Sequence, residues 1–200
     1  MVQQSPQTAP RVSAVALPNL LTYARIVAVP AVVASFYLPG DLGRWTALVI
    51  FVAAAVTDFF DGYLARAWQQ QSALGRMLDP IADKLLVAAA ILVLVADNSI
   101  GGWSLWAALI ILSREILVSG LRESLAEVRV SVPVTRLAKW KTTAQMVAIG
   151  FLLIGPAGED IFPYVEEVGL TLLWAAAILT LYTGYDYFRA GFKHLLGEDS

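Results

Sequence analysis

The sequence has no cysteine, a single histidine and few charged residues. The lack of cysteine excludes disulfide bonds and cysteine-ligated metal sites. The one histidine, His194, follows the last apolar segment and is interpreted as a solvated tail residue. Charged residues make up only 15% of the 200 residues, whereas hydrophobic residues make up 58%. This composition is too apolar for a soluble domain and predicts a membrane protein.

Six apolar segments are each close to the roughly 20 residues that a helix needs to cross a bilayer. They are 18–38, 45–66, 77–97, 103–123, 140–157 and 166–188. Connections are predicted at Gly40, 98–102 and 155–158 on one side, and at 67–76 and 124–139 on the other. We therefore expect an all-α, polytopic membrane protein with six transmembrane helices in a single domain, 1–200, with a disordered tail at 1–10. The first apolar segment is long and no small-residue cleavage site follows it, so a signal peptide is not expected.

The charged residues predict the orientation of these six segments. Ten of the fourteen basic residues fall on one side of the topology: Arg11, Arg66, Arg76, Arg122, Arg129, Arg136, Lys139, Lys141, Arg189 and Lys193. Arg44 is the lone basic residue on the opposite side. Cytoplasmic loops carry an excess of Lys and Arg, so both termini are expected in the cytoplasm.

Four aspartates interrupt the second and third apolar segments. Asp58 and Asp61 are three residues apart and Asp79 and Asp83 are four apart, so each pair shares a helix face. Eight residues separate Arg66 from Gly75, enough for a turn that folds the two helices back against each other. The four carboxylates would then meet at the cytoplasmic ends of both helices.

Carboxylates near a bilayer are unfavourable unless they are compensated, and Mg²⁺ and Mn²⁺ prefer such hard oxygen ligands. This predicts metal-assisted chemistry on a phosphate. The alternative is a proton or cation relay in a transporter. Gly62 and Ala65 favour the catalytic hypothesis, because small residues let a bulky ligand approach the helix. Arg66 adds a planar fork that suits a diphosphate.

Other polar residues are open to two interpretations. Arg114 is either an ion-pair partner of Glu115 or an aspartate, or part of an anion site that faces the acidic cluster. Basic residues near the fifth segment either contact anionic lipid or bind phosphate. Asn19, Thr22 and Arg25 recur every three residues, and either satisfy helix packing or face a nucleotide.

The spacing D-x2-D-G-x2-A-R-x8-G-x3-D-x3-D, from Asp58 to Asp83, resembles the signature of the CDP-alcohol phosphotransferase family. Segments 17–25, 113–123 and 139–145 resemble its bacterial members that make phosphatidylglycerophosphate, so the resemblance covers most of the chain. It implies transfer of a phosphatidyl group from CDP-diacylglycerol to sn-glycerol 3-phosphate, with release of CMP, by a homodimer in the bacterial cytoplasmic (inner) membrane whose active site faces the cytoplasm. No nucleic-acid partner is expected.

The resemblance also implies roles for individual residues. Two ions, Mg²⁺ or Mn²⁺, are expected at Asp58, Asp61, Asp79 and Asp83, with Asp83 also the catalytic base. The expected CDP-diacylglycerol-binding residues are Asn19, Thr22, Arg25, Asp58, Gly62, Ala65, Arg66 and Gly75. The expected glycerol-phosphate-binding residues are Arg114, Arg122, Lys139 and Lys141.

Three alternatives stay open, of which a purely structural membrane protein would have little reason to keep four buried acids. The same donor could serve another acceptor, such as serine, inositol phosphate or phosphatidylglycerol, although the basic cluster favours a phosphorylated one. A cation-coupled transporter is the non-enzymatic alternative, but it predicts acids spread across the depth of the bilayer.

Overall fold

The computed structural model describes residues 17–68, 73–127 and 136–195, and this part of the chain is all-helical. Six α-helices and one short 3₁₀ helix follow one another: α1 (Leu17–Ser35), α2 (Asp41–Trp68), α3 (Ala73–Ala96), α4 (Ser104–Glu127), α5 (Arg136–Ile154), η1 (Gly155–Gly158) and α6 (Val165–Leu195). Within these helices, the description does not extend to the side chains of 17–18, 59–68, 73–74, 76, 126–127, 136, 138–139 and 186–195.

Each predicted apolar segment coincides with one α-helix, so the all-α prediction is confirmed for the described residues. The three glycine-marked connections also lie between helices. Gly40, Gly102 and Gly155 have φ values of 59°, 52° and 44°, which glycine adopts without the steric conflict that a Cβ brings. Gly40 lies directly before α2, Gly102 lies two residues before α4, and Gly155 directly follows α5. The turn chemistry and the apolar runs therefore agree on where the helices stop.

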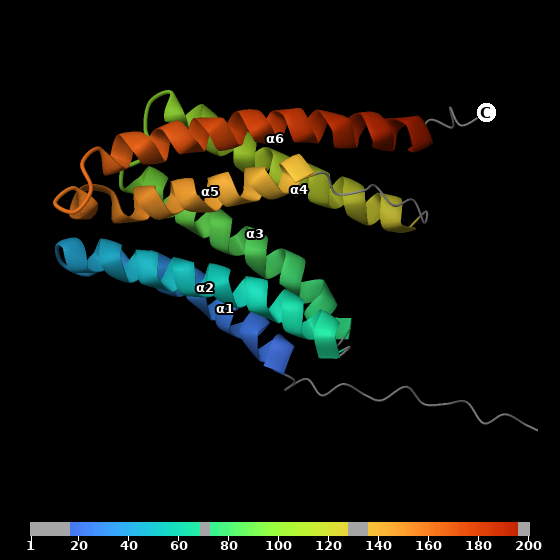
Figure 1. The fold of residues 1–200 in the computed structure, drawn as a ribbon, viewed down its shortest axis with the longest axis horizontal. Helices are drawn as coiled ribbons and strands as arrows, with labels where there is room; N and C mark the ends of the chain where they lie inside the picture. The colour runs from blue at the N-terminus through green and yellow to red at the C-terminus, as the bar shows by residue number, and fades with distance from the viewer. Residues whose placement is uncertain (1–16, 69–72, 128–135, 196–200) are drawn as a thin grey trace, which may run out of the picture.

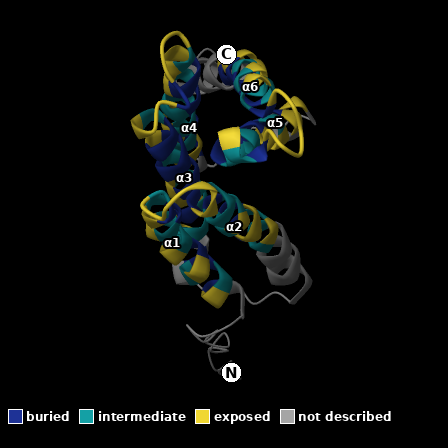
Figure 2. Ribbon diagram, turned by 90° about the vertical axis from the view of Figure 1, so that its left-hand side faces the viewer, coloured by how far each residue is buried: buried dark blue, intermediate teal, exposed yellow. Residues whose placement is uncertain are grey.

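The helices run up and down in one bundle (Figure 1). The start of α1, the end of α2, the start of α3 and the end of α6 lie at one end, and the three glycine turns lie at the other. In the view of Figure 2, α3 lies between α1–α2 and the group formed by α4, α5 and α6. Packing agrees with this view, because α1 contacts both α2 and α3, α6 contacts α4 and α5, and α3 also contacts α4 and α5.

Large apolar side chains occupy both the interior and the outer surface of the bundle. The core includes Phe51, Leu94 and Leu152, which are almost fully buried. Leu92 and Ile178 are examples of large hydrophobic residues that are more than half exposed, a pattern that marks a surface covered by lipid or protein. Among the described residues, two segments are long and apolar enough to cross a membrane, Ser104–Leu125 and Val165–Tyr185. These features are those of a membrane protein, whereas the six-span topology stays a prediction.

Arg44 joins four helices at the end of the bundle that carries the glycine turns. Its guanidinium pairs with Asp97 after α3, donates to Ser99 Oγ at 3.1 Å and donates to the Leu152 carbonyl of α5 at 3.3 Å. The guanidinium carbon also lies 5.6 Å from the centre of the Phe36 ring, beyond α1, within the range of a cation–π contact. Arg44, the lone basic residue that the sequence placed on this side, therefore links four helices.

Gly155 leaves the space that the Arg44 guanidinium occupies. A Cβ added there would lie 2.5 Å from Arg44 Nη1, whereas a Cβ at Gly102 would meet nothing within 4 Å. Both glycines have positive φ. Gly102→Ala should therefore lower the free energy of unfolding by about 1 kcal/mol through backbone strain alone. Gly155→Ala should lower it by roughly 1–2 kcal/mol more, because Arg44 must give up a charge-assisted hydrogen bond. Thermal unfolding of both variants in one detergent measures the difference, and equal shifts would show that Arg44 moves without loss.

Candidate functional site

Helix α1 holds the two aspartate-bearing helices together. Arg25 Nη1 lies 2.7 Å from Asp58 Oδ1 on α2, and Thr22 Oγ1 donates a hydrogen bond to Asp79 Oδ1 on α3. The Arg25 side chain is fully buried, whereas that of Asp58 is 47% exposed. A buried guanidinium requires a charged or hydrogen-bonding partner. The pairing therefore compensates Arg25 and orients a carboxylate that still reaches the surface.

This arrangement corrects one detail of the sequence interpretation. We expected α2 and α3 to fold directly against each other, but among the described residues α1 is the main packing partner of both. Asn19, Thr22 and Arg25, which share a stripe of α1, are all buried. Two of the three contact aspartates rather than an open cavity. The stripe thus has a packing role, and its predicted role in nucleotide binding stays a prediction.

The predicted metal ligands are only partly described. Asp79 and Asp83 lie one turn apart on α3, and Asp58 lies on α2. The side chain of Asp61 is outside the described residues, although α2 continues through its position to Trp68. Among the described side chains, no group of three or more acidic, histidine or cysteine residues is close enough to bind a metal ion. The four-carboxylate centre is therefore a prediction that the described part of the chain does not test.

A polar cavity of about 270 Å³ lies between α3, α4 and α5. It brings Asp83 together with three of the four residues predicted to bind glycerol phosphate, Arg114, Arg122 and Lys141. The remaining lining residues are Pro80, Lys84, Glu115, Val118, Ser119 and Thr142. The fourth predicted residue, Lys139, has its side chain outside the described part of the chain. The cavity therefore joins a carboxylate to a cluster of cations, which is what an anionic acceptor with a reactive hydroxyl requires.

Glu115 is a residue of this cavity that the sequence interpretation did not assign to the site. Its carboxylate Oε1 accepts a hydrogen bond from Lys141 Nζ, and it lies 3.9 Å from Arg114 Nη1. The sequence suggests Glu115 only as a partner of Arg114, whereas in the structure Lys141 is its closer partner. The Lys141 side chain is only 3% exposed, so the Glu115 carboxylate compensates the charge of a lysine that is almost completely shielded from solvent. The signal was present, because Glu115 lies inside a segment that carries the family resemblance.

The structure says little about the other residues predicted to bind CDP-diacylglycerol. Gly75, near the start of α3, is buried. The side-chain positions of Gly62, Ala65 and Arg66 on α2 lie outside the described residues. Their roles therefore stay predictions from the motif.

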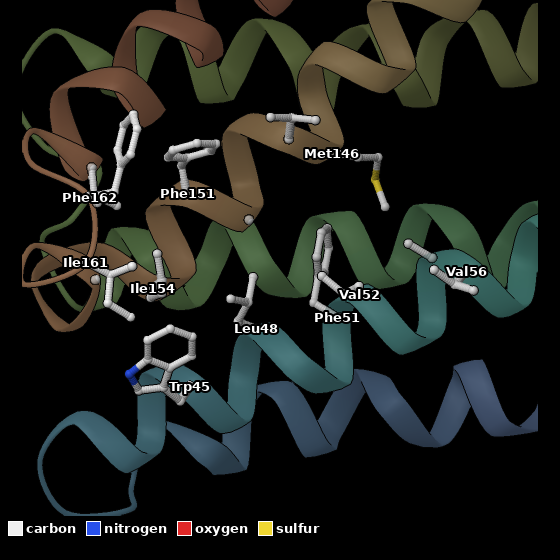
Figure 3. Close-up of a pocket in the computed structure, with 15 residues that line it drawn as sticks. Trp45, Leu48, Phe51, Val52, Val56, Met146, Phe151, Ile154, Ile161 and Phe162 are labelled. Carbon is white, nitrogen blue, oxygen red and sulfur yellow. The ribbon is translucent and has the colours of Figure 1, made fainter.

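A second, apolar cavity of about 670 Å³ lies between α2 and α5 (Figure 3). Val52, Val56 and Met146 line one part of it, and Trp45, Ile161 and Phe162 lie where α2 begins and α5 ends. Phe151 and Phe162 pack edge to face, with their ring centres 6.0 Å apart. Val56 is two residues before Asp58 on the same helix. The cavity thus extends along α2 from the neighbourhood of an aspartate toward the far end of the bundle.

Comparisons with known proteins identify a family and several similar proteins. The sequence model of a family described as CDP-alcohol phosphatidyltransferase matches residues 15–182. The chain is 49% identical over 178 residues to a Rickettsia bellii protein, covering 89% of this chain and 96% of the relative. It is 45% identical over 184 residues to a Shigella flexneri protein, with 91% and 98% covered. It is 41% identical over 216 residues to a Cereibacter sphaeroides protein, again with 91% and 98% covered. All three relatives are named CDP-diacylglycerol–glycerol-3-phosphate 3-phosphatidyltransferase.

The Lys141–Glu115 pair can be tested by a double-mutant cycle on stability. Lys141→Met and Glu115→Gln should each lower the free energy of unfolding by about 1–3 kcal/mol, because each leaves the other charge poorly compensated. The double variant should lose less than the sum, with a coupling of roughly 0.5–3 kcal/mol. Thermal unfolding in one detergent supplies all four values. Strictly additive losses would mean that the two side chains do not interact in solution.

Proposed function

The chain belongs to the CDP-alcohol phosphatidyltransferase family, and from this premise we propose that it transfers a phosphatidyl group from CDP-diacylglycerol to sn-glycerol 3-phosphate. The products are phosphatidylglycerophosphate and CMP, so the enzyme acts in phospholipid biosynthesis. The match of the family model confirms the family that the motif predicted. The observation that carries the proposed reaction is the polar cavity, in which Asp83 lies with Arg114, Arg122 and Lys141.

The cavity supports a small phosphorylated acceptor. Two guanidinium groups and an ammonium group can donate charge-assisted hydrogen bonds to one phosphate. Its volume of about 270 Å³ leaves little room for the acyl chains of phosphatidylglycerol, and serine has no phosphate for the cations to bind. The names of the relatives favour glycerol 3-phosphate over inositol phosphate.

The donor is assigned to α1 and α2. Asp58 lies beside the buried Arg25, and the motif places Asp61, Gly62, Ala65 and Arg66 along the next turns of α2, where they would bind the cytidine diphosphate. An acyl chain of the donor would occupy the apolar cavity between α2 and α5, whose lining on α2 ends at Val56, less than one turn before Asp58. A lipid headgroup at the aspartates and a chain along α2 suit a donor that stays in the membrane.

The predicted ligands, four aspartates, suit divalent metal ions, on which members of this family generally depend. Every predicted ligand is a carboxylate, and Mg²⁺ and Mn²⁺ prefer oxygen ligands of this kind. Arg25 and Thr22 each contact one Oδ1 atom and so orient Asp58 and Asp79. We assign two ions to Asp58, Asp61, Asp79 and Asp83. When bound, they would clamp the diphosphate and offset the charge on the leaving CMP.

The residues of the cavity define the chemical step. Arg114, Arg122 and Lys141 hold the acceptor phosphate, and Asp83 takes the proton from its free primary hydroxyl. That oxygen bonds to the phosphorus that carries diacylglycerol, and the bond from this phosphorus to the CMP oxygen breaks. The motif offers no cysteine or other free nucleophile, so the acceptor attacks directly rather than through a covalent enzyme intermediate.

The membrane arrangement follows from the same placement. We propose six transmembrane helices with both termini and the active site on the cytoplasmic side of a bacterial membrane. The start of α1 and the end of α6 lie at the same end of the bundle (Figure 1), which supports a common side for the termini. A homodimer is the assembly that the family resemblance implies.

Release of CMP by the purified protein tests the reaction. With CDP-diacylglycerol and Mg²⁺ or Mn²⁺, CMP should appear with glycerol 3-phosphate and not with serine, inositol phosphate or phosphatidylglycerol. EDTA should abolish turnover and either ion should restore it, because only oxygen ligands are predicted. Preferential use of another acceptor would reassign the substrate. Full activity after rigorous removal of metal would contradict the metal assignment.

Asp83→Asn separates binding from chemistry. Asparagine keeps the shape and one oxygen of the side chain but cannot accept a proton at neutral pH. Turnover should fall about a hundred- to ten-thousandfold, while the donor still binds. Asp58→Asn is the matched comparison and should weaken donor binding itself. Near-normal turnover of Asp83→Asn would reject its assignment as the base, and equal loss of donor binding in both variants would leave Asp83 as a metal ligand only.

A further inference from the structure

Helix α6 contacts the acceptor cavity indirectly, through the side chain of Arg114. Arg114 Nη2 on α4 donates to Thr183 Oγ1 on α6 at 3.3 Å. The Thr183 hydroxyl points its own hydrogen at its helix, because Oγ1 lies 2.9 Å from the Leu179 carbonyl and 3.3 Å from that of Thr180. A hydroxyl has one hydrogen to donate and two lone pairs to accept with. The backbone of α6 therefore leaves Thr183 as an acceptor aimed at Arg114.

The next residue along α6 gives Arg114 its space. A Cβ added to Gly184 would lie 3.3 Å from Arg114 Cγ and 3.7 Å from its Nε. The first distance is tighter than ordinary packing, so an alanine would push the arginine side chain by a few tenths of an ångström. Thr183 and Gly184 are both buried. One residue thus supplies a hydrogen-bond acceptor, and its neighbour supplies the gap through which the arginine passes.

Arg114 needs such support because it borders two different spaces. On one side it lines the polar cavity with Asp83 and Lys141. On the other side it lines an apolar groove between α4 and α6, of about 440 Å³, which includes Leu109, Leu181 and Tyr185. A long arginine side chain can bury its stem in apolar surroundings and turn its head toward either space. Its rotamer then decides whether the guanidinium reaches the acceptor.

We propose that Thr183 and Gly184 are positioning residues that hold Arg114 at the acceptor cavity and so set the affinity for the acceptor phosphate. The inference rests on the proposed function, which assigns Arg114 to that phosphate. Both residues lie beyond the span 15–182 that the family model matches. They act on the acceptor only through Arg114.

Steady-state kinetics on the full chain tests this role, with both substrates varied. Thr183→Val keeps the shape of the side chain but removes the acceptor, and should raise the KM for glycerol 3-phosphate about three- to tenfold. The KM for CDP-diacylglycerol should stay unchanged, and Thr183→Ser should restore the acceptor KM. Thr180→Val is the matched control, because Thr180 is buried one turn earlier and its hydroxyl has no hydrogen-bond partner in the described part of the chain. It should leave both KM values unchanged.

The role of Gly184 is tested by an alanine variant with a matched control. Gly184→Ala should raise the acceptor KM, whereas Gly120→Ala on α4 should not, because a Cβ at Gly120 meets nothing within 4 Å. In an Arg114→Ala background, Thr183→Val should add no further effect, since it acts through Arg114.

The outcomes separate the inference from the function on which it rests. If the wild-type protein does not release CMP with this pair of substrates, the proposed function fails. If the wild type is active but Thr183→Val leaves the acceptor KM unchanged, the positioning role is wrong. The same holds if Thr183→Val raises both KM values equally, or if Thr180→Val has the same effect, because these results indicate a packing role in α6. An additive loss on Arg114→Ala would also overturn the inference.

Discussion

A charge inside an apolar helix bundle needs a partner, and the placement of the first three helices depends on that requirement. Arg25 is fully buried on α1 and contacts Asp58 on α2. One turn earlier on α1, Thr22 donates to Asp79 on α3. Both contacts are lost if α1 rotates or slides by a residue. The need to compensate Arg25 and orient the aspartates therefore fixes how α1, α2 and α3 are placed relative to one another.

The two ends of the bundle use charge in different ways. At the end with the glycine turns, Arg44 is engaged on several sides by Asp97, Ser99 and the Leu152 carbonyl, which makes it a tie between helices. At the other end, the pair formed by Lys141 and Glu115 borders an open cavity. A buried ion pair adds little net stability, because desolvation offsets much of the attraction. Its value at the cavity lies in holding a lysine in place for an anion.

The sequence alone was sufficient for the helices, and it also named several residues that line the polar cavity. Apolar runs and glycines predicted where each helix lies, and the family resemblance grouped Arg114, Arg122 and Lys141 with Asp83. Spacing fixes which residues share a helix face, but it does not say which helix that face meets. For this reason α1 was not predicted as the main partner of α2 and α3. The pair of Glu115 and Lys141, 26 residues apart, is visible only in the structure, where these two side chains of α4 and α5 meet. Nothing in the local sequence of α6 marks Thr183 or Gly184, because their role arises only where α6 meets α4.

One turn of α3 connects the two halves of the site. Asp79 is contacted from α1, on the side assigned to the donor, and Asp83 lines the cavity assigned to the acceptor. Asp83 lies four positions after Asp79 on the helix, which corresponds to a rise of about 6 Å. Pro80 lies within this turn, and its carbonyl accepts a hydrogen bond from Lys84 at 2.8 Å. Displacement chemistry loses much of its rate when reacting groups are misplaced by about 1 Å. A helical turn holds its side chains more tightly than a loop, so carrying both aspartates on α3 keeps donor and acceptor in register.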